Sequence, residues 1–333
     1  MADHHPTIAP FHPPAWLRNA HAQTLYGALW TGGLPPHTAT LRHVTLPDGD
    51  AVAVHDDLPT DWNGRVAVLT HGLAADHRSP LLVRLAAKLV ARGVRVFRWD
   101  MRGCGAGVAL ARRTYHAGCS DDLGGVLAAV LDWCRADAPP REPEVTLFGV
   151  SLGGNVVLKY LGEDPAAVPP EVRRAMAINP PIDLCCAVRS LEGPINRLYD
   201  RHFLKALERQ VADRRRARPD APEPRRPRRP RTLYEFDDSF TAPLLGHADA
   251  AAYYREASSG PHVPAIRVPT TILTSRDDPL VPFAMFAPDR LTCPPTVRVV
   301  ATDHGGHCGY IGRAGRDPDH HWLEWRVVEL VTA

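Results

Sequence analysis

One serine of this chain has the surroundings of a nucleophile. Residues 149–153 read Gly-Val-Ser-Leu-Gly, and they follow the apolar run 145–148 and precede an amphipathic stretch over 155–161. A serine between glycines at a strand-to-helix turn is held in a strained conformation that exposes its hydroxyl, because larger flanking residues would clash. We therefore predict that Ser151 is a nucleophile. The alternative is an ordinary serine in a glycine-rich turn.

A serine hydroxyl is a weak nucleophile at neutral pH, so it needs a neighbouring base. The apolar run 296–300 predicts a strand, which leads into Asp-His-Gly-Gly-His over 303–307. We predict that His307, which follows two glycines, is the general base. His304 is the alternative base.

The base in turn needs a carboxylate that orients its ring. The run 269–274 predicts a buried strand, and Asp277 and Asp278 follow it. We predict that Asp278 is this carboxylate, because the run Asp-Pro-Leu-Val-Pro over 278–282 resembles the usual acid loop of such sites. Asp277 is the alternative acid.

Acyl transfer through a serine also needs two N–H donors that stabilise the negatively charged oxygen of the intermediate. The first predicted donor is the N–H of Leu152, at the start of the helix. The run 65–70 predicts another strand, which ends in His71-Gly72-Leu73, and Gly72 lets the backbone approach the nucleophile. We predict that the N–H of Leu73 is the second donor. His71 is expected to brace this loop, and a second base is the alternative.

The segments that position these residues alternate between strand-like and helix-like patterns. A nucleophile, an acid and a base in this chain order, each after a strand, are typical of the α/β-hydrolase fold. We predict an α/β protein of this fold: a mostly parallel eight-stranded sheet with helices on both faces and a helical lid insertion. The predicted strands are 41–46, 51–58, 65–70, 94–99, 145–148, 174–179, 269–274 and 296–300, and the predicted helices are 19–26, 80–92, 121–134, 155–161 and 320–330. Ser120 is expected to cap the third of these helices.

The alternation of strands and helices stops after residue 180 and resumes near residue 266. We therefore assign residues 1–182 and 266–333 to the hydrolase core, with an N-terminal arm over 1–40. Residues 183–265 are assigned to a cap or lid. A lid of this kind encloses the nucleophile, excludes water and shapes the acyl pocket.

A basic run occupies residues 213–231 of this insertion, after a helical patch over 194–212. It holds nine arginines against three acidic residues, together with five prolines. We predict an extended, solvated loop that forms no helix. Contact with an anionic membrane surface is the alternative. Nucleic-acid binding is disfavoured, because no aromatic residue is interleaved to stack on bases.

The composition argues against several classes of protein. No apolar run is long enough to span a membrane as a helix, and residues 1–6 lack the basic and apolar regions of a secretory signal. The seven cysteines include no Cys-x-x-Cys pair, so we predict no disulfide framework, no metal site and buried free thiols at Cys104, Cys119, Cys134 and Cys308. The predicted location is the reducing cytoplasm.

Nine distinct short motifs are spread along nearly the whole chain. They are Asn-Ala-His-Ala-Gln-Thr at 19–24, His-Gly-Leu at 71–73, Arg-Gly-Cys-Gly at 102–105, Tyr-His-Ala-Gly-Cys-Ser-Asp-Asp at 115–122, Gly-Val-Ser-Leu-Gly-Gly-Asn at 149–155, Glu-Phe-Asp-Asp at 235–238, Tyr-Tyr at 253–254, Asp-Asp-Pro at 277–279 and Gly-Gly-His at 305–307. Together they resemble the YheT branch of α/β-hydrolases, which includes bacterial esterases and animal abhydrolase-domain lipases. The resemblance implies a nucleophile at Ser151, an acid in the pair 277–278 and a base at His307. It also implies hydrolysis of short- to medium-chain or lipid-like esters without a cofactor.

We predict from these observations a serine hydrolase that cleaves carboxylic esters through an acyl-enzyme. Acyl transfer to an alcohol is one alternative, since the same three residues would serve it. A non-catalytic protein that binds a membrane or another anionic surface is the second. The acidic cluster 235–238 lies outside the expected strand ends, so we interpret it as an anchor of the lid. Catalytic carboxylates are the alternative for that cluster.

Overall fold

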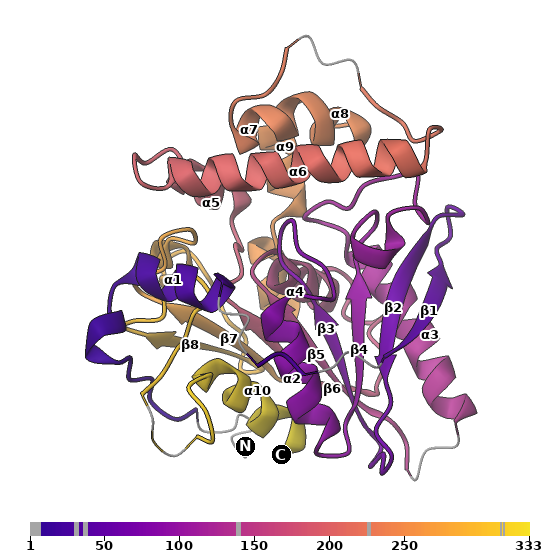
Figure 1. Cartoon of the computed structure of the whole chain (residues 1–333), viewed down its shortest axis with the longest axis vertical. Coiled ribbons are helices and arrows are strands. Elements are labelled where there is room, and N and C mark those ends of the chain that lie inside the picture. Colours follow the sequence, from indigo (N-terminus) through magenta and orange to yellow (C-terminus); the bar gives the residue numbers. More distant parts are fainter. Residues whose placement is uncertain are drawn as a thin grey trace.

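The eight-stranded sheet is the centre of the molecule (Figure 1). The computed structural model describes residues 8–29, 33–35, 39–137, 141–224, 228–313, 315 and 317–333. In the order β1-β2-β4-β3-β5-β6-β7-β8, the strands run side by side across the sheet. Their bounds are β1 (Thr40–Thr45), β2 (Ala51–Asp57), β3 (Arg65–Thr70), β4 (Arg95–Asp100), β5 (Glu144–Val150), β6 (Val172–Ile178), β7 (Thr270–Ser275) and β8 (Val297–Thr302).

Most neighbouring strands are parallel. β1 and β2 form an antiparallel hairpin, and β2 is also antiparallel to β4. The pairs from β4 through β3, β5, β6 and β7 to β8 are all parallel. The carboxyl ends of these six strands therefore meet at one edge of the sheet, which is where sites of open α/β sheets form. The predicted fold class is confirmed.

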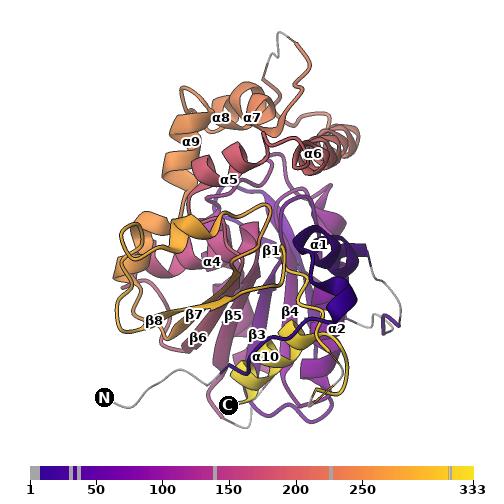
Figure 2. The same ribbon diagram turned by 90° about the vertical axis from the view of Figure 1, so that its left-hand side faces the viewer.

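Helices cover both faces of the sheet because its central strands are apolar on both sides. Val66 and Val68 of β3 pack in one apolar core with α3 (Ser120–Ala136) and α4 (Leu152–Glu163). The alternate residues Ala67 and Leu69 pack in a second core with α2 (Pro80–Val90) and α10 (Trp322–Thr332). Figure 2 shows α4 on one side of the sheet and α2 and α10 on the other.

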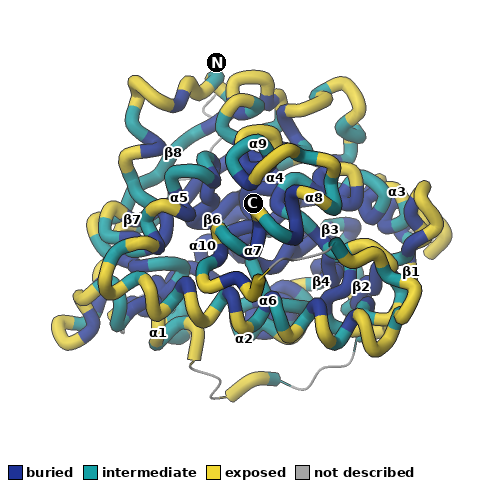
Figure 3. The backbone as a smooth tube through the Cα atoms, turned by 90° about the horizontal axis from the view of Figure 1, so that it is seen from above, coloured by how far each residue is buried: buried dark blue, intermediate teal, exposed yellow. Residues whose placement is uncertain are grey.

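A helical insertion separates β6 from β7 and lies above the carboxyl edge of the sheet (Figures 1 and 3). Its elements are α5 (Leu184–Ser190), α6 (Arg197–Ala217), α7 (Leu233–Phe236), the π-helical turn η3 (Asp237–Thr241), α8 (Ala242–Leu244), α9 (Ala250–Ala257) and η4 (Gly260–Ala265). We call α5 to α9 the cap layer. Seen from above in Figure 3, the buried strands lie beneath it.

The prediction that residues 213–231 form no helix is wrong for its first part. α6 continues to Ala217, and Arg214 is buried with its guanidinium donating to the Arg112 carbonyl at 2.8 Å. The helix continues because no proline interrupts it before Pro219 and because its buried stripe extends from Leu204 to Arg214. Residues 225–227 of the basic run lie outside the described residues.

The predicted cap of α3 is also wrong. Cys119 occupies the N-cap position, and Ser120 is the first residue of the helix. The Ser120 hydroxyl instead donates a hydrogen bond to the Glu163 carboxylate at 2.6 Å, since that partner lies within reach on α4.

The N-terminal segment carries the short 3₁₀ turn η1 (Ala15–Leu17) and the helix α1 (Ala20–Leu29). This confirms the helix predicted over 19–26. Two further 3₁₀ turns are η2 (Gly105–Gly107) and η5 (Phe283–Phe286). All seven cysteines are free; Cys104, Cys119 and Cys134 are buried as predicted, but the prediction is wrong for Cys308, which is only partly buried. Among the described residues, no helix has the length and apolarity needed to cross a membrane.

Candidate active site

Ser151 lies in a sharp turn between β5 and α4. Its backbone has φ +53° and ψ −122°, a strained conformation for a residue with a side chain. A Cβ atom on Gly149 would clash with the Gly153 carbonyl, and one on Gly153 would clash with the carbonyl of His71. Both glycines are therefore required by the turn, and the Ser151 hydroxyl is directed into a cleft under the cap layer.

The structure brings Ser151 together with the base and acid expected for it. His307 Nε2 lies 2.8 Å from Ser151 Oγ, and His307 Nδ1 lies 2.8 Å from Asp278 Oδ2. The three side chains come from the loops that follow β5, β7 and β8. They form a continuous hydrogen-bonded line, and this is the geometry in which a serine loses its proton to an oriented imidazole.

Asp278 is held by three further donors. Its Oδ1 accepts from the N–H groups of Leu280 and Val281 at 2.8 and 3.0 Å. Its Oδ2 accepts from the Asn179 side chain at 2.6 Å. Asn179 follows β6 in the left-handed region at φ +45° and itself accepts from the Tyr310 hydroxyl at 2.9 Å. Sequence reasoning missed Asn179.

The alternative acid and base have other partners. Asp277 Oδ1 accepts from the N–H of Gly306 at 2.9 Å, and its Oδ2 lies 3.4 Å from His304 Nδ1. Neither residue hydrogen-bonds to Ser151 within the described chain. Asp277 thus braces the loop that carries His307. The neighbouring residue, Asp278, is the acid that contacts the His307 ring.

The electrostatics of His307 suit a base with an anionic partner. Its burial disfavours the charged imidazolium and lowers its pKa, but the Asp278 carboxylate outweighs burial and holds the pKa well above the usual value for histidine. The Asp278 carboxylate therefore stabilises the protonated form of the His307 ring.

Helix α1 holds the histidine loop in place. Thr24 Oγ1 accepts from the N–H of His307 at 2.8 Å. The buried Gln23 side chain donates to the Ile311 carbonyl at 3.0 Å and accepts from the Ile311 N–H at 2.9 Å. His21 on the same helix lies 3.0 Å from the Tyr199 hydroxyl of α6. The sequence predicts a helix over 19–26 but carries no local signal for the positioning roles of its residues.

The predicted N–H donors line the same cleft as Ser151. Leu152 begins α4 directly after the serine, and Leu73 follows β3. A Cβ on Gly72 would lie 3.4 Å from that of Ser151, so this loop approaches the nucleophile closely. Within the described chain, neither N–H donates to a side chain or a loop carbonyl.

His71 braces this loop through backbone hydrogen bonds, as expected. Its Nδ1 lies 2.8 Å from the Gly72 carbonyl, and its Nε2 accepts from the Met101 N–H at 3.1 Å. Burial lowers its pKa, so the ring is neutral with the proton on Nδ1.

His55, His77 and Asp100 form a second buried cluster, and their ligand atoms lie within 4.8 Å of one another. Asp100 accepts hydrogen bonds from both rings and also from the N–H groups of His77 and Ala106. Its oxygens lie 2.8 to 3.2 Å from the two rings, which are hydrogen-bond lengths. We interpret the cluster as a brace for the loop that follows β3.

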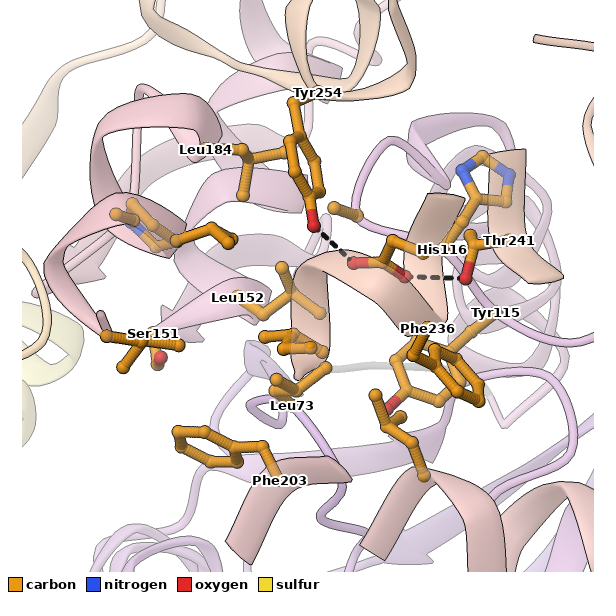
Figure 4. A pocket seen from close by; sticks show the side chains of 18 of the residues that line it. Leu73, Tyr115, His116, Ser151, Leu152, Leu184, Phe203, Phe236, Thr241 and Tyr254 are labelled. Atoms are coloured by element: carbon orange, nitrogen blue, oxygen red, sulfur yellow. Dashed lines mark hydrogen bonds between the residues drawn. The ribbon is translucent and has the colours of Figure 1, made fainter. Parts of the chain in front are cut away.

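The cleft is mostly apolar and extends beneath the cap layer (Figure 4). About 900 Å³ of space in the cleft and its open mouth is not filled by protein atoms. Its apolar lining comes from several elements of the core and the cap: Leu73, Leu152, Leu184, Val188, Leu191, Phe203, Leu207, Val211, Leu233, Phe236, Leu280 and Val281.

The acidic cluster 235–238 lies in the cap layer and hydrogen-bonds there. Glu235 accepts from the N–H of Arg231 at 2.8 Å, and Asp238 accepts from that of Ala250 at 3.0 Å. Asp237 accepts from the Tyr254 hydroxyl of α9 at 2.7 Å. None of these acids hydrogen-bonds to Ser151 or His307 in the described chain, and these contacts are those of an anchor.

Comparison with known proteins gives one consistent family. A sequence profile described as the alpha/beta hydrolase fold matches residues 67–314. YheT of Escherichia coli (strain K12), an esterase by name, is 30% identical over 332 residues, which cover 97% of this chain and 93% of YheT. The medium-chain fatty acid ethyl ester synthase/esterase 2 of Saccharomyces cerevisiae is 27% identical over 96% of this chain and 68% of its own length.

Solved structures agree on the fold. An esterase of Pyrococcus furiosus superposes with a TM-score of 0.55 at 16% identity, over 89% of this chain and 92% of that one.

Proposed function

This chain belongs to the alpha/beta hydrolase fold family, and from that premise we propose that it hydrolyses carboxylic esters, with Ser151 as the nucleophile. His307 is the general base in this proposal, and Asp278 orients it. The observation that carries the proposal is the line of two 2.8 Å contacts from Ser151 Oγ through the His307 ring to Asp278. An ordinary serine has no need of this arrangement.

In the first half of the reaction, His307 Nε2 takes the proton of Ser151 while Oγ attacks the ester carbonyl. The carbonyl oxygen becomes negatively charged and accepts hydrogen bonds from the N–H groups of Leu73 and Leu152. Each donor of this kind contributes about 3 kcal/mol to the stabilisation of the transition state. The tetrahedral intermediate then collapses, and His307 passes its proton to the departing alcohol.

In the second half, water replaces the alcohol. His307 accepts a proton from the water, whose oxygen attacks the acyl-serine carbonyl, and the same two N–H groups stabilise the second intermediate. Its collapse releases the carboxylic acid, and the proton returns from His307 to Ser151. Asp278 stabilises the imidazolium twice in each cycle without itself becoming protonated.

A fluorophosphonate probe tests the nucleophile directly, because it labels an activated serine covalently. We expect the wild-type protein to be labelled and the Ser151→Ala variant to remain unlabelled, with circular dichroism showing that the variant is folded. Labelling that survives the substitution contradicts the assignment. If the folded wild-type protein is not labelled and no ester is cleaved, the non-catalytic binding protein becomes the better interpretation.

The apolar cleft supports esters with short- to medium-chain or lipid-like acyl groups as substrates. The leucine and phenylalanine side chains beneath the cap offer no partner to a polar acyl chain along most of the cleft. We propose that the cap, residues 183–265, acts as a lid that encloses this chain and excludes water, while 1–182 and 266–333 form the core. A series of nitrophenyl esters of increasing chain length measures the preference as kcat/KM.

Acyl transfer to an alcohol is the second candidate. It is favoured by one observation: the similar Saccharomyces cerevisiae protein is named both a synthase and an esterase of medium-chain ethyl esters. The same acyl-serine would react with ethanol in place of water. With ethanol added, formation of ethyl ester in preference to the free acid supports transfer, whereas release of free acid alone supports hydrolysis.

Two interpretations of the basic run 213–231 remain: it is a solvated insertion, or it contacts anionic lipid. Two of its exposed arginines pair with acids of the cap that lie outside the run: Arg228 with Glu235 and Arg229 with Glu208. These pairs reduce the positive charge offered to a membrane, and they support the solvated insertion.

A further inference from the structure

A buried carboxylate lies in the wall of the apolar cleft. Asp237 is 8% exposed and lines the same cleft as Ser151. Its Oδ2 accepts from the Tyr254 hydroxyl at 2.7 Å, and its Oδ1 accepts from the Thr241 hydroxyl at 2.6 Å. Figure 4 shows both bonds as dashed lines, at the side of the cleft away from Ser151.

No cation compensates this carboxylate within the described chain. The described residues that line the cleft include no lysine or arginine. His116 lines the same region, but burial lowers its pKa to about 4, so its ring is neutral at pH 7. Two hydroxyl groups are the partners of Asp237, and burial still raises its pKa to about 6. A buried charge without a counter-charge is costly.

The local backbone also departs from a regular helix at this point. Asp237 and Thr241 are the first and last residues of the π-helical turn η3. Such turns are rare, and they occur frequently at functional sites because they reorient side chains that a regular helix would direct elsewhere. Here the turn contributes Asp237 and Thr241 to the cleft wall, while Phe240 of the same turn is fully buried in the core.

We propose that Asp237 is a specificity-determining residue that binds a hydrogen-bond donor, a hydroxyl or an ammonium group, at the far end of the substrate's acyl chain. The proposal deepens the ester hydrolysis proposed above and rests on it. A carboxylate has about four acceptor positions, and the protein fills two with Tyr254 and Thr241. A donor on the substrate fills another, whereas an unbranched alkyl chain would press a methyl group against the desolvated charge.

The structural alternative is that Asp237 only ties η3 to α9 through Tyr254. That role predicts that a substitution of Asp237 lowers kcat/KM by the same factor for all substrates. Binding of a donor predicts a loss confined to substrates that carry one. The two roles are therefore distinguished by the ratio of kcat/KM between substrates with and without the donor, and not by the overall activity.

The test compares pairs of nitrophenyl esters that differ only at the chain end. Nitrophenyl ω-hydroxyoctanoate and nonanoate place a hydroxyl or a methyl group at the same position, and ω-aminooctanoate supplies the ammonium. Shorter and longer pairs cover other depths of the cleft. We expect the wild-type enzyme to favour the best-fitting hydroxy or amino ester about ten- to a hundredfold in kcat/KM over its methyl partner, as for a hydrogen bond to a charged group.

Two substitutions remove different parts of the arrangement. Asp237→Leu should bring the ratio of kcat/KM between the donor-bearing ester and its methyl partner to about one, whatever its effect on the overall rate. Tyr254→Phe breaks the tie to α9 but leaves the acceptor, so the preference should survive. Asp238→Asn is the matched control, since Asp238 bonds to the N–H of Ala250 and does not line the cleft.

The wild-type measurements alone can overturn the proposal, even if Asp237→Leu fails to fold. Hydrolysis of the alkyl esters with no preference for a donor at any chain length refutes the role of Asp237 and leaves ester hydrolysis intact. Absence of hydrolysis of every ester refutes the proposed function itself. Equal losses for both members of each pair in a folded Asp237→Leu variant assign Asp237 to the structural role.

Discussion

Asp277 and Asp278 are adjacent in the chain but serve different partners. Asp278 contacts the His307 ring and is fixed by two backbone N–H groups and Asn179, whereas Asp277 fixes the N–H of Gly306. The loop after β7 thus places one carboxylate on the His307 ring and the other on the loop that carries His307. The run 278–282 favours Asp278 from the sequence alone, whereas the partner of Asp277 is visible only in the geometry.

Exchange of each carboxylate for an amide should separate these roles. We expect Asp278→Asn to lower kcat by about 10⁴-fold, because the amide no longer stabilises the imidazolium or fixes its tautomer. Asp277→Asn keeps an acceptor for the Gly306 N–H, so its kcat should stay within about tenfold of wild type. Steady-state kinetics on one nitrophenyl ester measures both. The reverse ranking would transfer the acid's role to Asp277.

The pH dependence of the reaction reports on His307. Only the neutral ring accepts a proton, so kcat/KM should rise with pH and be lost as the pH falls below the raised pKa of His307. In Asp278→Asn the anion that raises this pKa is gone while burial still lowers it, so the midpoint should move to lower pH. A pH–rate profile of both proteins checks this. A midpoint that is unchanged, or that moves upward, argues against His307 as the base.

At the scale of elements, α1 contributes to the site although it lies far from it in the sequence. Gln23 joins α1 to the segment after His307 across 288 residues of chain, and Thr24 bonds directly to the His307 N–H. Gly306 and Gly309 permit this approach, because a Cβ on either would clash with the backbone of α1. The helix therefore positions His307, although none of its described residues lines the cleft.

Loss of these bonds should reduce both stability and activity. Gln23→Leu leaves buried backbone groups of Leu17 and Ile311 without partners, and we expect it to cost about 1–3 kcal/mol of unfolding free energy. kcat should fall as well, since the His307 loop is less well fixed. Leu25→Gln on the exposed face of α1 is the matched control and should change neither. Urea denaturation and ester kinetics measure both effects. A Gln23→Leu protein with unchanged stability and activity would contradict the role of α1 in positioning His307.

The elements differ in how far the sequence could predict them. Ser151, His307 and Asp278 have local signals, since each follows an apolar strand and glycine or proline marks its turn. Asn179 and Gln23 have none, because their partners lie 99 and 288 residues away. The end of α6 was missed because the arginine and proline content of 213–231 suggested a loop, whereas Arg214 continues the buried stripe of the helix. The cap of α3 was missed because Glu163 competes for the Ser120 hydroxyl.

At the scale of the whole molecule, charge is distributed unevenly. The chain has a net charge of +2, although the run 213–231 alone holds nine arginines and three acids. Acids outside the run compensate two of these arginines, since Arg228 pairs with Glu235 and Arg229 pairs with Glu208. The basic run is therefore less positive toward a partner than its composition indicates.

Sedimentation with lipid vesicles tests whether the run contacts a membrane. Exposed ion pairs contribute little individually, and an arginine near an anionic surface contributes about 1 kcal/mol. Because the acids of the cap already hold Arg215, Arg218, Arg228 and Arg229, we expect little binding to phosphatidylserine vesicles at physiological salt. Changing these four arginines to glutamine should alter neither that binding nor ester hydrolysis. Phosphatidylcholine vesicles are the uncharged control. Sedimentation that requires phosphatidylserine, weakens with salt and disappears in the variant would instead make the run a lipid contact that brings the cap to its substrate.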